Sequence, residues 1–413
     1  MIAAPLVAEP VPEIWDRSGL PGWAYHSPAF LALEKAELFA THWQIACHVS
    51  DLPGPGAWVS LDIGDDRALV IRGQDGVIRA VHNLCRHRGA RVAAGDSGQC
   101  RNALVCPFHG WVYNLDGSLR GPARPKTFGD LDRSHYGLKP MESEVWMGFV
   151  FVRCRPGPQP SVAETLAAFA AAFADYRPDE LEPAGPVWTS EIAVNWKSVR
   201  DVDNEGYHVA MAHPALQDLY GSNYRDYISP EGLSWSLAPF SAHGGRRWSV
   251  RHYLKILPDQ PRLPEDKRRA WGYYGVFPNA VFTMTPEGVQ FYQEFPLGTD
   301  RTLIRSLAYR RLDEDRRTRL ARYLAGRIDR ETQNEDIQLS IWSNEAMKSS
   351  AFEGFHLSDL EWGVRRYHDR LRGVLPVLTC PDAPPEDRMR AMNDRLRTGR
   401  DRRPAGHLQG ALQ

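Results

Sequence analysis

Four cysteine and histidine side chains in one stretch of the chain could bind a metal cluster. Cys85 and His87 form a Cys-x-His pair, and Cys106 and His109 form a Cys-x-x-His pair further along. A [2Fe–2S] cluster needs this set when two cysteines bind one iron and two histidines bind the other. Zinc accepts the same ligands, but zinc fingers pair cysteine with cysteine and histidine with histidine. We therefore predict a two-iron cluster, with Cys100 between the pairs as a bystander.

A second stretch, residues 195–214, could hold a single metal ion through His208 and His213. Taken alone this is weak evidence, because histidine pairs more often serve packing or lie at the surface. The two are five positions apart, which on a regular helix of about 100° per residue places them roughly 140° apart. Binding one metal through both predicts an irregular turn between them. Pro214 favours such a turn because it discourages helical geometry at the preceding residue.

Length and composition limit the functions that are open to this chain. Its 413 residues, 43% of them apolar, suffice for two domains, and a net charge of −1 implies no attraction to nucleic acid or to an acidic membrane. The six cysteines show no disulfide pattern, which favours a reducing compartment. No apolar run approaches the ~18 residues of a membrane span, and the proline-broken start is not typical of a signal peptide. We expect a cytoplasmic protein.

The elements that must position these residues predict an α+β protein of four parts. Residues 1–42 are expected to be an N-terminal arm and a helix that packs on the catalytic domain. Short alternating strands between glycine and proline turns predict an all-β domain over 43–155, which carries the cluster ligands. Residues 156–380, which include the histidine pair, are expected to form a large antiparallel sheet covered by helices, in a helix-grip-like manner if this is the catalytic domain that the family resemblance described below implies. Residues 381–413 form a polar tail that frays or packs on a neighbour.

Several local predictions within these parts can be checked directly. Ser27 is expected to cap a helix that starts at Pro28, and Ser161 to cap a helix that runs to Tyr176. The apolar run Trp146–Cys154 reads as one strand. Apolar residues at helical spacing predict two long helices in the last third, over Asp313–Trp342 and Leu357–Val374.

The motifs also resemble those of a known family. CRHRGA (85–90) and CPFHGWVYNLDG (106–117) are similar to the two cluster-binding loops of Rieske-type proteins. Their order before NWK…E-x-YH-x4-HP (195–214) resembles the terminal oxygenase (α) subunit of Rieske non-heme iron oxygenases, which include aromatic ring-hydroxylating and quaternary-ammonium enzymes. The first motif alone implies a cofactor and no particular reaction, because Rieske domains also occur in electron carriers.

The resemblance implies ligands for a mononuclear Fe(II) site. His208 and His213 would supply two of them, and a carboxylate from a later helix the third, leaving positions open for O₂. The matching stretch, RETQNEDIQLSIW (330–342), assigns that carboxylate to Asp336. The other acids of this helix are expected to be solvated charges: Asp329, Glu331 and Glu335.

Two acidic residues before His208 are also assigned from the resemblance. The family uses an acid at the position of Glu205 to bridge a cluster histidine of one subunit, here His109, to an iron histidine of the next, here His208. Quaternary-ammonium oxygenases usually carry glutamate at this position, and ring-hydroxylating members aspartate. Asp201 stands where many relatives have an asparagine near the iron, so we expect it in the surroundings of the iron, with a competing ligand role left open.

The implied function is a terminal oxygenase that activates O₂ at Fe(II) with electrons from its [2Fe–2S] cluster and hydroxylates a small organic substrate. The chain has no dinucleotide-binding loop or flavin motif, so a separate NAD(P)H-dependent reductase, with or without a ferredoxin, must supply the electrons. A homo-oligomer is expected, with a trimer favoured. We favour N-methyl or quaternary-ammonium oxidation. Ring mono- or dioxygenation, an electron carrier without oxygenase activity and a zinc-stabilised binding module are the alternatives.

The substrate pocket is expected between the second histidine stretch and the sheet. Its candidate lining residues, each of which could equally be core packing, are Leu216, Leu219, Trp235, Phe240, Tyr273 and Phe291. Aromatic side chains there would suit a methylated ammonium through cation–π attraction, or an aromatic ring through stacking.

Overall fold

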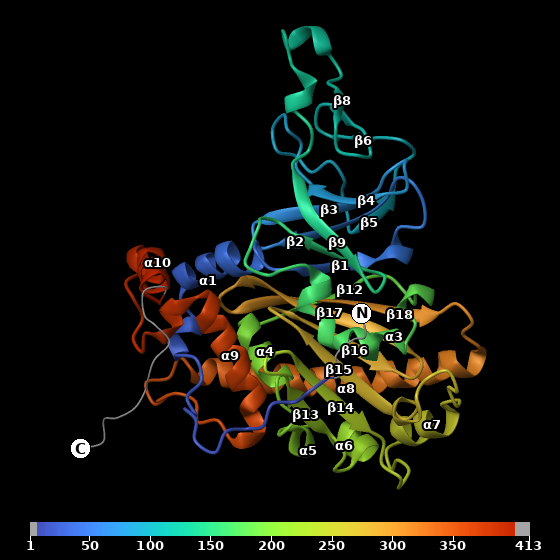
Figure 1. The fold of residues 1–413 in the computed structure, drawn as a ribbon, viewed down its shortest axis with the longest axis vertical. Coiled ribbons are helices and arrows are strands. Elements are labelled where there is room, and N and C mark those ends of the chain that lie inside the picture. The colour runs from blue at the N-terminus through green and yellow to red at the C-terminus, as the bar shows by residue number, and fades with distance from the viewer. Residues whose placement is uncertain (1–5, 401–413) are drawn as a thin grey trace.

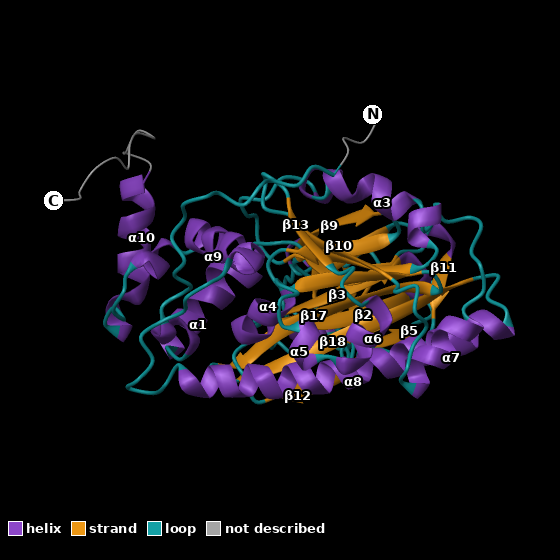
Figure 2. Cartoon of the chain, turned by 90° about the horizontal axis from the view of Figure 1, so that it is seen from below, coloured by secondary structure: helices purple, strands orange, loops and turns teal. Residues whose placement is uncertain are grey.

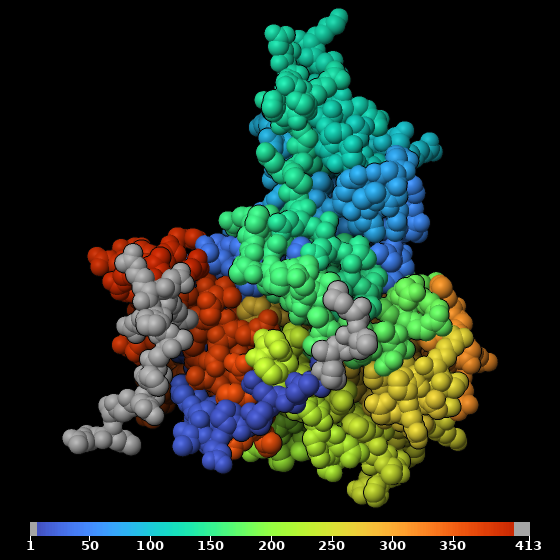
Figure 3. All heavy atoms as spheres, viewed as in Figure 1, coloured from blue at the N-terminus to red at the C-terminus, as the bar shows by residue number. Residues whose placement is uncertain are grey.

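The computed structural model describes residues 6–400, so positions 1–5 of the predicted arm and 401–413 of the predicted tail lie outside the described residues. The molecule has a narrow all-β part that stands on a broader part of mixed helices and strands (Figures 1 and 3). No described helix is long and apolar enough to cross a membrane.

The narrow part is built on a seven-stranded antiparallel sheet in the order β1-β10-β9-β4-β3-β2-β5. A three-stranded sheet, β6-β7-β8, lies beyond it at the tip (Figure 1). The strands are β1 (Gln44–His48), β2 (Ala57–Ile63), β3 (Asp66–Arg72), β4 (Ile78–His82), β5 (Ser97–Gln99), β6 (Leu104–Val105), β7 (Val112–Tyr113), β8 (Leu119–Gly121), β9 (Pro140–Trp146) and β10 (Phe149–Arg153).

The apolar run Trp146–Cys154 is not the single strand that we predicted. Met147 and Gly148 take φ values of 48° and 76° and form a two-residue turn that joins β9 to β10. Positive φ at both turn residues is the geometry that two-residue hairpins favour. A side chain at position 148 would collide with the ring of His48, so only glycine fits there.

The broad part is built on an eight-stranded antiparallel sheet, with β11-β18-β17-β16-β15-β14-β13 in order and β12 paired to β18. The strand bounds are β11 (Leu181–Pro183), β12 (Trp188–Ile192), β13 (Arg225–Ile228), β14 (Ser234–Pro239), β15 (Ala270–Val276), β16 (Ala280–Thr285), β17 (Gly288–Gly298) and β18 (Arg301–Arg311). Successive side chains of a strand point to opposite faces of the sheet, so alternate residues of one strand lie in different environments. On β17, Phe291 packs into the core shared with β1 and β10, whereas Tyr292 and Glu294 line a cavity on the other face.

Helices cover the cavity face of this sheet, and the long helix α8 runs along it (Figure 2). The helices are α1 (Pro28–Glu34), α2 (Val162–Thr165), α3 (Ala170–Ala174), α4 (Trp196–Asp203), α5 (Val209–Ala212), α6 (Pro214–Tyr220), α7 (Trp248–Ile256), α8 (Arg316–Ala346), α9 (Trp362–Val374) and α10 (Met389–Arg400). Ser27 caps α1 as predicted, because its side chain accepts the Phe30 N–H.

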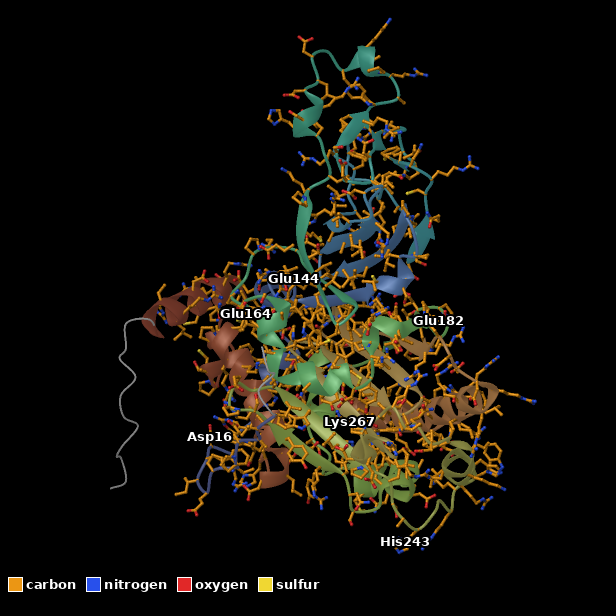
Figure 4. The ribbon with its side chains drawn as sticks, turned by 45° about the vertical axis from the view of Figure 1, so that its right-hand side comes forward. Asp16, Glu144, Glu164, Glu182, His243 and Lys267 are labelled. Atoms are coloured by element: carbon orange, nitrogen blue, oxygen red, sulfur yellow. The ribbon has the colours of Figure 1, made fainter. Side chains whose placement is uncertain are left out.

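The helix predicted over Ser161–Tyr176 starts with its capping box but is not continuous. Ser161 and Glu164 bond each other's backbone N–H groups, and Glu144 of β9 accepts the next N–H at 2.7 Å; Figure 4 labels both glutamates where the two parts meet. Leu166, at φ −109° and ψ 17°, then ends α2. Leu166, Phe169 and Phe173 are all buried in the same core. Their burial against the sheet outweighs the preference for a continuous helix.

The prediction of a polar tail over 381–413 is partly wrong. Met389–Arg400 forms helix α10, which packs against α1. Met389 and Asn393 are buried, and the Asn393 side chain accepts the Val377 N–H at 3.2 Å. Two buried residues four apart give this Arg-rich helix one face that docks, which its overall polarity concealed.

Candidate active site

Two loops with the same backbone bonding carry the predicted cluster residues. The N–H groups of Cys85 and Cys106 donate to carbonyls five residues on, at 2.7 and 2.8 Å. In each loop the glycine four residues after the cysteine, Gly89 or Gly110, has a positive φ and donates back to the cysteine carbonyl. Each loop thus curls around its cysteine, which glycine permits because it lacks a Cβ.

The structure brings the four predicted cluster ligands together as two thiols and two imidazoles. Cys85 and Cys106 are buried at 2% exposure, whereas the rings of His87 and His109, 4.7 Å apart, lie toward the surface. Burial raises the pKa of the Cys85 thiol, so a bound cation is what would favour its thiolate. The donor set fits a two-iron cluster with a buried cysteine end and an accessible histidine end.

Aromatic residues that the sequence analysis did not single out hold this arrangement. The Tyr113 hydroxyl lies 3.2 Å from Sγ of Cys85 and accepts the Arg86 N–H at 2.9 Å. The Trp111 ring stacks on His87, with 5.3 Å between centroids and 8° between planes. Both aromatics follow the second loop directly, in CPFHGWVYNLDG, so their place in the motif was the available signal.

A second group of donor atoms converges between α5, α6 and α8. Nε2 of His213 lies 3.0 Å from Nε2 of His208 and 2.8 Å from Oδ1 of Asp336, and the third edge of the triangle is 3.5 Å. Atoms about 3 Å apart match adjacent corners of an octahedron with metal–ligand bonds of about 2.1 Å. The three donors therefore fit one face of an octahedral metal site.

The irregular turn predicted between the histidines is present. His208 directly precedes α5, and α5 ends at His213, whose φ of −117° and ψ of 80° break the helix. Pro214 then opens α6 at its first position, where its missing N–H costs nothing. This break turns both imidazoles toward Asp336 on α8.

Carboxylates bind the outer nitrogen of each histidine. Nδ1 of His208 donates to Glu205 at 2.5 Å, and Nδ1 of His213 donates to Glu335 at 2.8 Å. With Nδ1 held as the donor, Nε2 is the nitrogen of each ring that can release a proton and bind a metal. Although burial opposes it, hydrogen bonds to Asp336 and Glu205 raise the pKa of His208 to about 10, so the site attracts positive charge.

Two acids of α8 are not the solvated charges that we predicted. Glu335 holds His213, and Asp329 lines the cavity in front of the triad, where burial raises its pKa to about 6. Asp329 lies seven residues before Asp336, about two helical turns along the same face, which is why it reaches the cavity. Glu331 points elsewhere and pairs with Arg327 at 3.5 Å.

Asp201 is not in the surroundings of the triad, which corrects the prediction. Its carboxylate accepts the Tyr25 hydroxyl at 2.5 Å and contacts Nε2 of His368 at 2.7 Å. It thereby ties α4 to the N-terminal segment and to α9. Asp203, two residues further on and so on the opposite side of α4, faces the cavity in its place and binds Arg200 at 3.1 Å and the Tyr292 hydroxyl at 3.2 Å.

A cavity of about 130 Å³ opens in front of the triad. Of the six predicted lining residues, Leu216 and Tyr273 face it. The other four are core packing: Leu219, Trp235, Phe240 and Phe291. Strand and helix residues that the sequence did not mark complete the wall, among them Val202, Tyr224, Val281, Tyr292, Glu294 and Ile304.

Comparison with protein families identifies two matched regions of the chain. A model of the Rieske [2Fe-2S] domain matches residues 42–132, and a model of the ring hydroxylating alpha subunit (catalytic domain) matches residues 178–376. The chain thus carries a Rieske domain followed by a domain of the ring-hydroxylating α-subunit type. The predicted family and fold class are confirmed, and the two domains of this family imply a Rieske cluster, a mononuclear iron and O₂ as cosubstrate.

The relatives of this chain include enzymes named for quaternary ammonium compounds. The glycine betaine monooxygenase oxygenase subunit of Chromohalobacter salexigens is 36% identical over 52% of this chain and 50% of its own length. The carnitine monooxygenase oxygenase subunit of Escherichia coli K12 is 28% identical over 65% of this chain and 69% of its own. The chain thus spans about half the length of the glycine betaine relative that it matches.

A solved structure supports the fold. That of a quaternary ammonium Rieske monooxygenase superposes with a TM-score of 0.73, over 86% of this chain and 95% of the other. The two sequences are 22% identical in this superposition, so the likeness concerns the fold.

Proposed function

We propose that this chain is a terminal oxygenase that hydroxylates an N-methyl group of a small cationic substrate. The observation that carries the proposal is the triad of His208, His213 and Asp336, whose three donors occupy one face of an octahedron and leave the other face toward the cavity. A substrate in that cavity would lie against the open side of the site.

The reaction class follows from what the two cofactors supply. When bound, the cluster delivers single electrons and the mononuclear iron activates O₂. The balanced reaction takes O₂, two electrons, two protons and the N–CH₃ group to N–CH₂OH and water. The carbinolamine then breaks its C–N bond, releases formaldehyde and leaves the demethylated amine.

The side chains of this chain have separate roles in the proposal. Cys85, His87, Cys106 and His109 hold the cluster, and His208, His213 and Asp336 hold the iron. Glu205 and Glu335 keep the imidazoles oriented with Nε2 toward the metal. The wall of the cavity excludes bulk water, which strengthens the interaction of its carboxyls with a bound cation.

A homo-oligomer, with a trimer favoured, is part of the proposal. The strands β6 and β8 near the cluster loops lie at the top of Figure 1, whereas α5 and α6 at the triad lie at the bottom. Exposed apolar side chains flank both sites, with Phe108 beside His109 at 55% exposure and Tyr207 and Met211 beside the triad at 58% and 89%. Contact between these surfaces of two chains would let Glu205 bridge His208 to the partner's cluster.

Electrons must enter from a separate protein in this proposal. An NAD(P)H-dependent reductase, with or without a ferredoxin, would reduce the cluster at its exposed histidine end. The cytoplasm is the proposed location, because the described cysteines are all free thiols, as expected in a reducing compartment.

Ring hydroxylation is the second candidate function. The family of the catalytic domain is named for it, and the aromatic side chains of the cavity would stack on an arene. The acidic wall favours a cation instead, because an uncharged arene gains nothing from buried carboxyls.

The test starts with protein purified without oxygen. The proposal expects iron and acid-labile sulfide together with a Rieske EPR signal after reduction, then NADH oxidation and formaldehyde release that depend on an N-methylated cation and on added reductase. Zinc without sulfide would contradict the cluster. Arene hydroxylation without formaldehyde from any N-methyl compound would support the second candidate.

A further inference from the structure

Apart from the two triad histidines, the charged residues that line the cavity are acidic. Besides the triad and its partner Glu205, the lining holds Asp203, Glu294 and Asp329, and no lysine or arginine of residues 6–400 lines it. A substrate that enters this space exchanges water for carboxyl groups from α4, β17 and α8. The charge of the wall therefore selects among substrates of the same size and shape.

One of these carboxyls is poorly satisfied. Glu294 is fully buried, neither of its oxygens accepts an N–H or a hydroxyl group, and a second carboxyl, that of Asp203, is its neighbour. Its nearest cation, Arg200, lies 3.7 Å away and is shared with Asp203, to which it is bound at 3.1 Å. Buried carboxyls are normally satisfied, so this one marks a place where a ligand group completes the site.

Asp329 brings a further carboxyl to the opposite wall. The Gln333 amide, from the same face of α8, donates to it at 2.9 Å. Asp329 and Glu294 come from a helix and from the sheet that it covers, so their carboxyls reach the cavity from two sides. A positive charge between them would be stabilised from both directions.

The uncharged part of the wall suits a cation as well. Tyr224, Tyr273 and Tyr292 line the cavity together with aliphatic residues. The faces of tyrosine rings carry negative partial charge and attract ammonium groups, including those without N–H donors. Acids and rings thus favour the same ligand charge.

We infer that the substrate is a cation that carries no carboxylate, such as a trimethylammonium alcohol or a methylated amine. This inference rests on the proposed function and narrows its substrate. Glycine betaine and carnitine, the compounds that name the relatives above, each pair their ammonium group with a carboxylate. Such a carboxylate would lie among Asp203, Glu294 and Asp329, where no lysine or arginine of residues 6–400 lines the cavity to receive it.

The neighbouring cavity does not supply the missing cation. This space of about 620 Å³ shares Trp188, Asp329 and Gln333 with the first and is lined by arginines, among them Arg322 and Arg330. Arg330 lies six residues from Asp336, about 9 Å along the helix at 1.5 Å per residue. The carboxyl carbon of glycine betaine is two bonds from its nitrogen and cannot span that separation.

Three probes of matched size test the inference on the purified holoprotein under nitrogen. Choline has the trimethylammonium head without a carboxylate, glycine betaine has both, and the carbon isostere of choline replaces the ammonium by a tert-butyl group. Calorimetry should give choline an affinity at least about tenfold above each of the others, because only choline gains from the acidic wall without a like-charge contact.

Two variants of α8 connect the selectivity to the wall. Asp329→Asn should lower choline affinity by about threefold to tenfold and leave the isostere unchanged, because it removes charge at constant shape. Glu331→Gln, two residues away and paired with Arg327 outside the cavity, should change neither. The same calorimetry reports both variants without need for turnover.

The outcomes separate the inference from the proposed function. Betaine that binds as tightly as choline, or Asp329→Asn that weakens the isostere equally, would overturn the inference while formaldehyde release from betaine still upheld the oxygenase. Failure of both ammonium compounds to bind or to release formaldehyde would overturn both.

Discussion

The Glu205 carboxylate holds His208 at two points: one oxygen accepts the proton of Nδ1 at 2.5 Å and the other accepts the backbone N–H at 3.1 Å. The residue is therefore fixed both at its ring and at the start of α5. Any change of charge at Glu205 acts on the metal through the basicity and direction of this one imidazole.

We expect Glu205→Gln to slow electron arrival at the triad without unfolding the site. The amide keeps the shape but lacks the charge that holds the imidazole proton, so substrate-dependent reoxidation of the reduced cluster should slow by about tenfold to a hundredfold. Freeze-quench EPR in a single turnover measures this rate. Glu205→Asp keeps the charge, so its reoxidation rate should lie between those of the wild type and Glu205→Gln. An unchanged rate in Glu205→Gln would exclude the bridging role.

Asp336→Asn and Glu335→Gln should distinguish a residue that binds the iron from one that only orients an iron ligand. Loss of the Asp336 carboxylate removes one of three donors, so the mononuclear iron should be lost while the Rieske EPR signal persists. Glu335→Gln only loosens His213 and should weaken iron affinity by about tenfold. Iron analysis against EPR-active cluster measures both. Full iron in Asp336→Asn would place the third ligand elsewhere, and Glu331→Gln serves as the matched control.

Cys85→Ser and Cys100→Ser should behave oppositely although both are single thiol replacements in the same domain. Cys85 faces Cys106 and the Tyr113 hydroxyl, so its loss should abolish the visible absorption of the cluster. Cys100 donates to the Gly56 carbonyl at 3.3 Å, outside both loops, and its replacement should leave the spectrum intact. Bleaching in Cys100→Ser would contradict the ligand assignment.

Glu287 should make folding stability depend on pH. It sits in the turn between β16 and β17 at 1% exposure, bonded to the Tyr253 hydroxyl at 3.0 Å, and burial raises its pKa from 4.5 to about 7. The folded state then holds a proton that the unfolded state has released, so stability falls as pH rises from 4.5 to 7, by about 3 kcal/mol.

Urea denaturation of the wild type and of Glu287→Gln at a series of pH values isolates this contribution. The difference between the two unfolding free energies should vary across that window, because the amide cannot ionise, and level off above it. A constant difference would show that Glu287 stays in one protonation state.

Period-2 alternation predicted much of the sheet well, because burial on one face leaves a direct mark on the sequence. The segment predicted to be all-β, 43–155, contains the strands β1 to β10 and no α-helix. The break at Met147 was missed because the run is apolar throughout, and the close approach of His48 that demands glycine comes from another strand.

The ligand residues were within reach of sequence because cysteine and histidine at short spacing are rare without a metal. The surroundings of the other acidic residues were harder to predict. Asp201 binds Tyr25 and His368, which lie far away in sequence, so no local pattern could reveal them. Asp329 was accessible in principle, since its seven-residue spacing from Asp336 places both on one helix face. The predicted domain boundaries and the roles of the site residues stay predictions.

The placement of the two sites at opposite ends of one chain has a genetic consequence. If each reaction uses the cluster of one chain and the triad of its neighbour, the functional unit is a cluster and a triad from two different chains. A chain without a cluster and a chain without iron then lack different members of this unit. Two inactive alleles, Cys85→Ser and Asp336→Asn, would then complement when expressed together, because mixed assemblies contain intact pairs. Either variant expressed in excess over the wild type would lower activity by more than the fraction of variant chains in the mixture.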